Sequence, residues 1–360
     1  MNKDLLYLGI ISAGAYFYYK SKENFSENND IELLLDGLTV KEVAISGKSP
    51  LKNKEKYHNY PDDGAVFESD DGGWIYVSNS EAGYREGGVG ALRFNSNGDL
   101  IDYNMILKNT TKNCSGGKTP FNTWLSCEEH DQGMVWECDP FQKNLARPYP
   151  KMGIFSHESA AVDPNSKIVY LTEDDTDGLF YRFLPNSKLQ AACYGKGSNI
   201  IWKDVVHNKL PVKYQVKDGI KNNKWEGCVF HPDGYIYIAE TRKGIFRYNI
   251  KKNTLKLFYK SERKGDPTKL NAPDNICITP KGNLLVTEDP GATWTNYLEL
   301  WVINHKTRKS YPLLRVHNHD GSELTGGSFT KDGKRLYFSS QRGKNGNGIT
   351  YEVKGDFSNI

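Results

Sequence analysis

The chain has 360 residues and a net charge of +3, from 47 basic and 44 acidic side chains. This near balance excludes the strongly basic field of a nucleic-acid-binding protein, and we expect no nucleic-acid partner. Glycine (34) and tyrosine (22) are abundant and long Leu/Ala/Glu-rich stretches are missing, which favours an all-β protein of many short strands joined by tight turns.

The N-terminal stretch from Leu5 to Tyr19 (LLYLGIISAGAYFYY) carries no charge. As a helix it would span roughly 22 Å, and flanking Tyr and Lys side chains can extend it toward the hydrocarbon core of a bilayer. No small-x-small cleavage site follows it, so we expect an uncleaved membrane anchor over residues 1–22. The protein is then a single-pass, membrane-anchored protein whose orientation is open. Residues 23–58 are expected to form a polar stalk and lead-in, and residues 59–360 the folded domain.

The folded domain contains six segments with one shared outline. Each has an acidic or small polar opening, an apolar pair, a turn, and a strand that ends in an acid. The segments are residues 63–81, 116–129, 158–174, 226–241, 273–289 and 323–341. Turn sequences such as PNSK, HPDG, TPKG and TKDG separate β-branched or aromatic runs within them, which is typical of hairpins.

Further strand candidates lie between the repeated segments, for example residues 244–259 and 298–314. Two strands in each segment and two between segments make a four-stranded sheet, and the repeat length of about 40–50 residues is that of propeller blades. A β-sandwich is the main competitor, but sandwiches do not repeat one hairpin six times. The sequence therefore predicts an all-β, six-bladed β-propeller with an N-terminal hydrophobic anchor helix.

Acidic residues recur at equivalent places in the repeat. The strand ends contribute Glu81, Glu129, Glu173, Glu240 and Glu288, and the segment openings contribute Glu158, Glu226, Asp274 with Asn275, and Glu323. Each acid alone could cap a turn and face solvent. As a set in one register they are expected to converge on the channel axis, where carboxylates stay ionised only with cations between them. Oxygen ligands at this density favour Ca²⁺ or another hard cation.

The run NCSGGKTPFNTWLSCEE (residues 113–129) resembles the signature of the PhoX-type alkaline phosphatases. FSHESAAVDPNSKIVYLTED (residues 155–174) resembles the next block of that family. EGCVFHPDG, PDNICITPKGNLLVTED and ELTGGSFTKDGKRLYFSS resemble later blocks in order, so the resemblance covers residues 60–350.

This resemblance implies a propeller with an iron and calcium cluster in its channel that hydrolyses phosphate monoesters. It makes Cys114 the thiolate ligand of iron, Glu129, Glu158 and Glu226 further metal ligands, and a small phosphate ester the substrate. The carry-over extends less distinctly to Glu81, Glu288 and Glu323. A thiolate suits iron better than calcium, so one Cys among carboxylates would bind iron selectively and leave calcium to the carboxylates.

The chain departs from the family at Lys224, where the family places a phosphate-binding Arg two residues before the Glu matched by Glu226. A lysine is a point charge and does not offer the bidentate fork of arginine. We expect Lys224 and Arg242 to contact the phosphate, with Arg342 as a further candidate.

Two other functions remain open at this stage. One is a hydrolase of the gluconolactonase or strictosidine-synthase-like kind, which would use a single Ca²⁺ held by residues such as Glu226 and Asn275. The other is a non-catalytic propeller that binds a partner and keeps its acids for a structural ion. In each case we expect a monomer.

Overall fold

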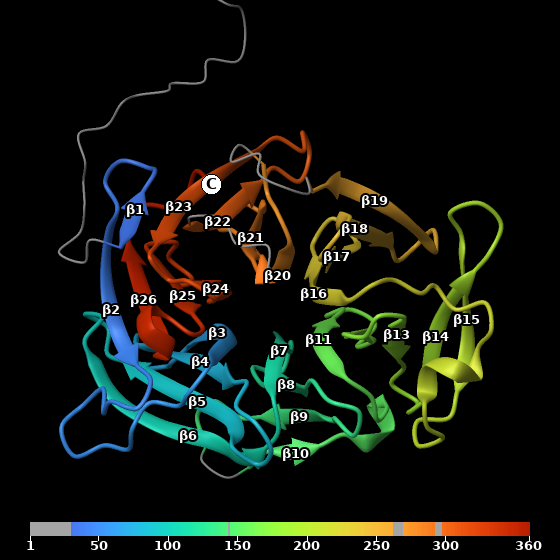
Figure 1. The fold of residues 1–360 in the computed structure, drawn as a ribbon, viewed down its shortest axis with the longest axis horizontal. Coiled ribbons are helices and arrows are strands. Elements are labelled where there is room, and N and C mark those ends of the chain that lie inside the picture. Colours follow the sequence, from blue (N-terminus) through green and yellow to red (C-terminus); the bar gives the residue numbers. More distant parts are fainter. Residues whose placement is uncertain (1–29, 143–144, 262–268, 292–296) are drawn as a thin grey trace, which may run out of the picture.

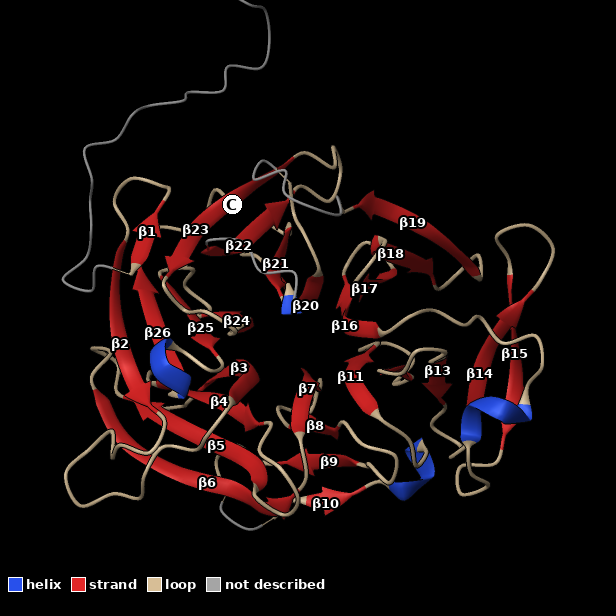
Figure 2. Ribbon diagram, viewed as in Figure 1, coloured by secondary structure: helices blue, strands red, loops and turns tan. Residues whose placement is uncertain are grey.

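A computed structural model describes residues 30–142, 145–261, 269–291 and 297–360. Across these residues the strands form six antiparallel sheets, arranged around a central axis like the blades of a propeller (Figure 1). The prediction of a six-bladed β-propeller is therefore confirmed. In this part of the chain helix occurs only as short 3₁₀ turns, among them η1 (Pro150–Met152), η2 (Val212–Gln215) and η4 (Lys344–Gly346), and the strands dominate the molecule (Figure 2).

Blades 1 to 3 follow one another along the chain. Blade 1 consists of β3 (Pro61–Glu68), β4 (Trp74–Ser80), β5 (Gly87–Phe94) and β6 (Leu100–Thr110). Blade 2 consists of β7 (Asn113–Lys118), β8 (Trp124–Glu128), β9 (Val135–Cys138) and β10 (Arg147–Pro148). Blade 3 consists of β11 (His157–Val162), β12 (Val169–Glu173), β13 (Phe180–Phe183), β14 (Leu189–Tyr194) and β15 (Ile200–Val205).

Blades 4 to 6 follow in chain order, and blades 5 and 6 each include one strand from the beginning of the described chain. Blade 4 consists of β16 (Trp225–His231), β17 (Tyr235–Glu240), β18 (Gly244–Asn249) and β19 (Thr254–Lys260). Blade 5 consists of β20 (Pro273–Ile278), β21 (Leu284–Glu288), β22 (Tyr297–Ile303), β23 (Ser310–His317) and β1 (Ile31–Leu33). Blade 6 consists of β24 (Leu324–Phe329), β25 (Arg335–Ser340), β26 (Ile349–Lys354) and β2 (Thr39–Ile45).

The pairing of β2 with β26 closes the propeller, because it joins the start of the described chain to the last blade; Val40 lies opposite Val353. Strand β1 likewise pairs with β23, with Ile31 opposite Val316. Part of the expected lead-in, residues 23–58, thus forms outer strands of two blades. The predicted anchor, residues 1–22, lies outside the described residues, and no helix within the described ranges is long and apolar enough to cross a membrane.

The hydrophobic core is divided among the spaces between neighbouring blades. Each of six buried apolar clusters combines residues of two consecutive blades. Adjacent residues of one strand enter different clusters: Tyr76 packs with Tyr337 of blade 6, whereas Val77 packs with Trp124 of blade 2. Side chains alternate between the two faces of a strand, and both faces are buried here. This explains why the strands are apolar almost throughout.

The first strand of each repeated segment is the innermost strand of its blade. Strands β3, β7, β11, β16, β20 and β24 contact one another in sequence around the axis, and their ends surround the centre of the molecule in Figure 1. The two ends of these six strands therefore determine what lines the two halves of the channel.

Candidate metal centre

A β-bulge interrupts every innermost strand near its beginning. In β3 the pairing with β4 shifts by one residue between Pro61 and Gly64, and the same shift occurs in the other five blades. A bulge re-aims the side chains of the unpaired residues. In each of the first five blades, one acidic or thiol residue directly follows the pair that precedes the bulge. These residues are, in blade order, Asp62, Cys114, Glu158, Glu226 and Asp274.

A second set of polar side chains follows the last residue of the neighbouring strand in each blade. These side chains are Glu81, Glu129, Asp174, Thr241, Asp289 and Gln341. They lie at the same end of the sheets as the bulges, because the two strands of each pair run antiparallel. Together with Glu323, which precedes β24, the acidic and thiol members of both sets form what we call the acidic centre.

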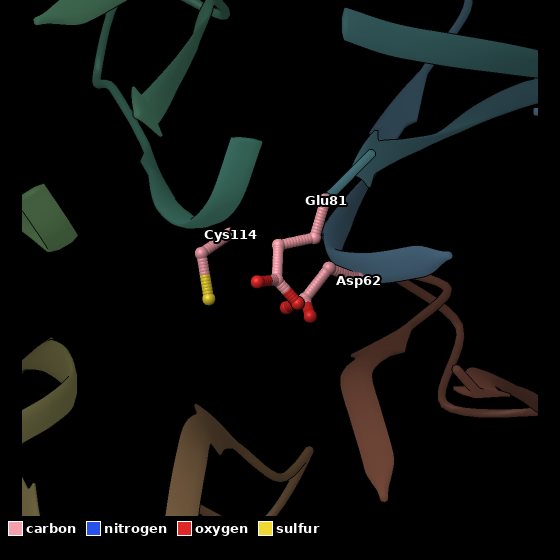
Figure 3. A group of neighbouring side chains, drawn as sticks. All are labelled: Asp62, Glu81 and Cys114. Atoms are coloured by element: carbon pink, nitrogen blue, oxygen red, sulfur yellow. The ribbon is translucent and has the colours of Figure 1, made fainter. Parts of the chain in front are cut away.

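The acidic centre contains two groups of three side chains. Within each group the three ligand atoms lie within 4.8 Å of one another. One is Asp62, Glu81 and Cys114, and the other is Glu158, Glu226 and Asp274. Figure 3 shows the first group, with the carboxylates of Asp62 and Glu81 side by side and the side chain of Cys114 next to them. The Cys114 thiol donates to Glu158 Oε1 at 3.4 Å, which connects the two groups.

Burial and mutual repulsion raise the pKa of Glu129, Glu158 and Glu226. Desolvation is the main cause for Glu158, whose pKa lies well above its usual range, and the carboxylates of Glu226 and Asp274 add to it. The pKa of Glu226 rises to about 8 by desolvation and the neighbouring Asp174, and that of Glu129 to about 9 by desolvation and Glu81. Buried carboxyl groups this close cannot all ionise without cations between them.

Only three basic side chains of the described residues contact the acidic centre. Lys112 Nζ lies 3.9 Å from Glu81 Oε1 and 3.6 Å from Glu129 Oε2. Lys224 Nζ is 2.8 Å from Asp174 Oδ2, and an Arg342 guanidinium nitrogen is 2.7 Å from Glu323 Oε1. The three basic groups contact different carboxylates at the edge of the acidic centre, which we call the rim. Their positive charges are too few to balance the negative charges of the carboxylates.

Two buried oxygen atoms of this region have no hydrogen-bond donor among the described residues, Asp174 Oδ1 and Gln341 Oε1. The Gln341 amide nitrogen is already committed to Asp62 Oδ2 at 2.5 Å and Glu81 Oε2 at 2.8 Å. A buried acceptor without a donor is costly, and a bound cation would satisfy it. The donor set of carboxylates, one amide oxygen and one thiol therefore fits metal ions.

Three of the predicted ligands lie outside the acidic centre although they are buried. Glu173 accepts hydrogen bonds from the Leu179 amide (3.0 Å) and the Tyr181 hydroxyl (2.8 Å). Glu240 accepts from the backbone amides that begin the next turn, and Glu288 accepts from the amides of Asn271 and Glu299. Each is the last residue of its strand, and the residue after it turns toward the axis.

The remaining predicted residues have distinct places. Asn275 supports Asp274, because its Nδ2 donates to Asp274 Oδ1 at 3.2 Å while its Oδ1 accepts from the Gly326 amide at 2.8 Å. Arg242 is exposed, and its backbone amide donates to Glu240. Lys224 contacts the acidic centre through Asp174.

Sequence reasoning did not single out five side chains of the two sets: Asp62, Asp174, Thr241, Asp289 and Gln341. A signal was present, since Asp62–Asp63, Glu173–Asp174 and Glu288–Asp289 are pairs of consecutive acids. In such a pair only one member can point to a given face of a strand.

Fold and site together define a six-bladed propeller with a carboxylate- and thiol-lined centre at one end of its channel. A family model described as alkaline phosphatase PhoX matches residues 64–134 and 129–201. The resemblance to the PhoX-type alkaline phosphatases is thereby confirmed. No curated protein matches the chain in sequence.

Solved structures share the fold at low sequence identity. PhoX of Pseudomonas fluorescens, in complex with the transition state analogue vanadate, aligns with a TM-score of 0.75 and 15% identity over 94% of this chain and 98% of that chain. The gluconolactonase XC5397 of Xanthomonas campestris aligns with a TM-score of 0.54 and 12% identity over 93% and 98%. A luciferin-regenerating enzyme aligns with a TM-score of 0.52 and 13% identity over 89% and 96%.

Proposed function

We propose that this protein is a metal-dependent phosphatase that hydrolyses phosphate monoesters at an iron and calcium cluster in the acidic centre. The observation that carries the proposal is the contact between two ligand groups, the partly buried Asp62–Glu81–Cys114 and the buried Glu158–Glu226–Asp274. The family resemblance supports the same reaction. The bound metals would supply charge neutralisation of the phosphate and an activated oxygen nucleophile at ordinary pH.

The two ligand groups would bind different metals. Cys114, as a thiolate, would favour iron, and the purely carboxylate group of Glu158, Glu226 and Asp274 would favour calcium. Thr241 donates its hydroxyl hydrogen to Glu226, which orients that carboxylate. Such partners behind the ligands fix the ligand geometry and tune metal affinity.

The basic side chains at the rim would bind the phosphate oxygens. In the structure Lys112, Lys224 and Arg342 each contact a carboxylate of the centre. With those carboxylates neutralised by bound metal, Lys112, Lys224 and Arg342 would be available to a phosphate dianion. Arg342 offers the planar fork that Lys224 lacks, and it lies across the centre at Glu323.

The single-calcium hydrolase is less well supported. Its expected Glu–Asn pair is not free, because the Asn275 amide oxygen already accepts from Gly326 and its nitrogen donates to Asp274. Membrane anchoring through residues 1–22 and a monomeric state stay predictions, as does a non-catalytic role for the metals.

The test uses the full chain loaded with iron and calcium. Elemental analysis counts each metal per chain, and release of p-nitrophenol from p-nitrophenyl phosphate measures turnover. We expect both metals and a vanadate-inhibited phosphatase activity. Glu158→Gln should lower activity about a hundredfold, because it removes a proposed carboxylate ligand that also accepts a hydrogen bond from Cys114.

Glu173→Gln is the matched control, since Glu173 is an equally buried acid of the same blade that binds Leu179 and Tyr181 instead. It should keep metal content and activity. A folded, fully metal-loaded chain without turnover would support the non-catalytic propeller, and one calcium without iron would support the single-calcium hydrolase.

A further inference from the structure

The channel changes character along its axis. Next to the acidic centre along the channel axis, a layer of hydrogen bonds connects the innermost strands of neighbouring blades. The Ser115 hydroxyl donates to Asp63 Oδ2 at 2.8 Å, and Ser159 Oγ donates to the Gly116 carbonyl at 3.1 Å and accepts from the Cys228 amide at 3.0 Å. These bonds link blades 1 to 4 and separate the two ends of the channel.

At the end opposite the acidic centre the channel opens into a cavity of about 430 Å³, lined by all six innermost strands. This volume lies in the range of small-molecule pockets. Its wall is mainly apolar and includes Val229, Phe230, Ile278 and Phe329. Those four side chains are only half-buried, so a ligand in the cavity would remove further apolar surface from water.

The cavity has one cationic lining residue, Lys118. Its Nζ lies 2.8 Å from the Val66 carbonyl oxygen and 4.5 Å from the centroid of the Phe67 ring. Within the described ranges Lys118 forms no ion pair, and desolvation lowers the pKa of its ammonium group. The acidic lining residue, Asp63, is engaged by Ser115 and by the Gly64 amide at the inner end.

The Glu68 carboxylate acts on Lys118 electrostatically but forms no ion pair with it. An ammonium group of this kind beside an open apolar cavity is complementary to an amphipathic anion. We propose that this cavity binds a small organic anion, a carboxylate or sulfonate carried on an apolar body. The acid group pairs with Lys118, and the apolar body contacts Val229, Phe230 and Ile278. Such a site is separate from the acidic centre and independent of phosphatase activity.

The probe is 1-anilinonaphthalene-8-sulfonate, titrated into the metal-loaded full chain and followed by its fluorescence. We expect saturable binding of one probe per chain, displaced by octanoate but not by inorganic phosphate. Displacement by phosphate would place the probe in the acidic centre and overturn the proposal, as would the lack of saturable binding.

Two substitutions locate the probe. Lys118→Met keeps most of the length of the side chain and removes its charge. It should weaken binding roughly tenfold, as expected for a hydrogen bond to a charged group. Cys277→Phe adds a ring from a half-buried lining position and should also weaken binding.

Lys281→Met is the control, because Lys281 is an exposed lysine of a blade turn that does not line the cavity. It should bind the probe like the unaltered chain. If Cys277→Phe fails to fold, Lys118→Met decides alone. Probe binding that is equally strong in a folded Lys118→Met protein would show that the cavity does not recognise anions through this residue.

Discussion

Cys114 differs from the other cysteines in its neighbours. Burial and the carboxylates of Asp62 and Glu158 raise the pKa of its thiol far above the usual range, so without a metal it is a protonated donor to Glu158. A thiol in such surroundings becomes a thiolate only by coordinating a cation. In the proposed metal centre Cys114 would therefore serve as a ligand, and its protonated thiol is poorly suited to act as a free nucleophile.

Replacing Cys114 by Ala should abolish iron binding and lower phosphatase activity about a hundredfold or more, because a first-row metal loses its thiolate. The measurement is iron and calcium per chain together with p-nitrophenyl phosphate turnover. Cys277→Ala, a half-buried cysteine at the opposite end of the channel, is the control. Full iron content in Cys114→Ala would contradict the assignment.

Lys224 has a more modest predicted role, because it is one of three basic groups at the rim. Lys224→Ala should raise KM for p-nitrophenyl phosphate roughly tenfold with a smaller change in kcat, and Lys224→Arg should retain or improve KM. Metal content should not change in either. The exposed Arg242 offers the comparison: Arg242→Ala should leave KM unaltered if only residues that contact the acidic centre bind phosphate.

At the level of elements, closure of the ring depends on two short strands far from the rest of their blades in sequence. Strand β2 covers the outer edge of β26, and β1 covers that of β23. Ile31 and Ala44 are buried by these pairings. An uncovered strand edge exposes unpaired backbone groups and promotes aggregation.

Deleting residues 1–46 should therefore lower the melting temperature by roughly 5–10 °C and cause concentration-dependent association, because it exposes the edges of β23 and β26. Thermal unfolding and light scattering measure the two effects. Deletion of residues 1–29 keeps both strands and serves as the control. Equal melting temperatures for the two truncations would show that β1 and β2 contribute little.

For the whole molecule, we expect the acidic centre to couple stability to pH and to metal ions. In the unfolded chain Glu129 and Glu226 titrate near their usual pKa of 4.5, whereas in the folded, metal-free protein their pKa values are about 9 and about 8. Between these values the native state holds more protons than the unfolded state. Without metal, the contribution of these two groups to stability is therefore fully present below pH 4.5 and is lost progressively as pH rises toward 9.

The melting temperature of the chelator-treated protein should fall between pH 5 and pH 9, by about 2 °C or more for each kcal/mol lost. Added calcium should restore it most strongly above pH 7, because binding then displaces fewer protons. Thermal scans with and without calcium across this range measure the effect. A calcium-induced shift of equal size at pH 5 and pH 9 would contradict it.

The sequence by itself determined the architecture. Turn residues at fixed offsets, such as HPDG and TPKG, and apolar runs on either side of them are local features, so the hairpins could be located from them. Six copies of one hairpin left a propeller as the fold that suits the repeat. Cys114, Glu129, Glu158, Glu226 and Asp274 were also identified from their places in the repeat or in the family motif, and the structure brings them to one end of the channel.

Only the tertiary structure decided which of two consecutive acids faces the axis. Glu173 and Glu288 end their strands and hold backbone amides, while Asp174 and Asp289, one residue later, repel the buried carboxylates of the centre. A shift of one residue turns a side chain to the other face of a strand, and a bulge in the partner strand adds such a shift. The closure by β2 and the cavity at Lys118 depend likewise on segments that are distant in sequence, whose contacts no local pattern specifies.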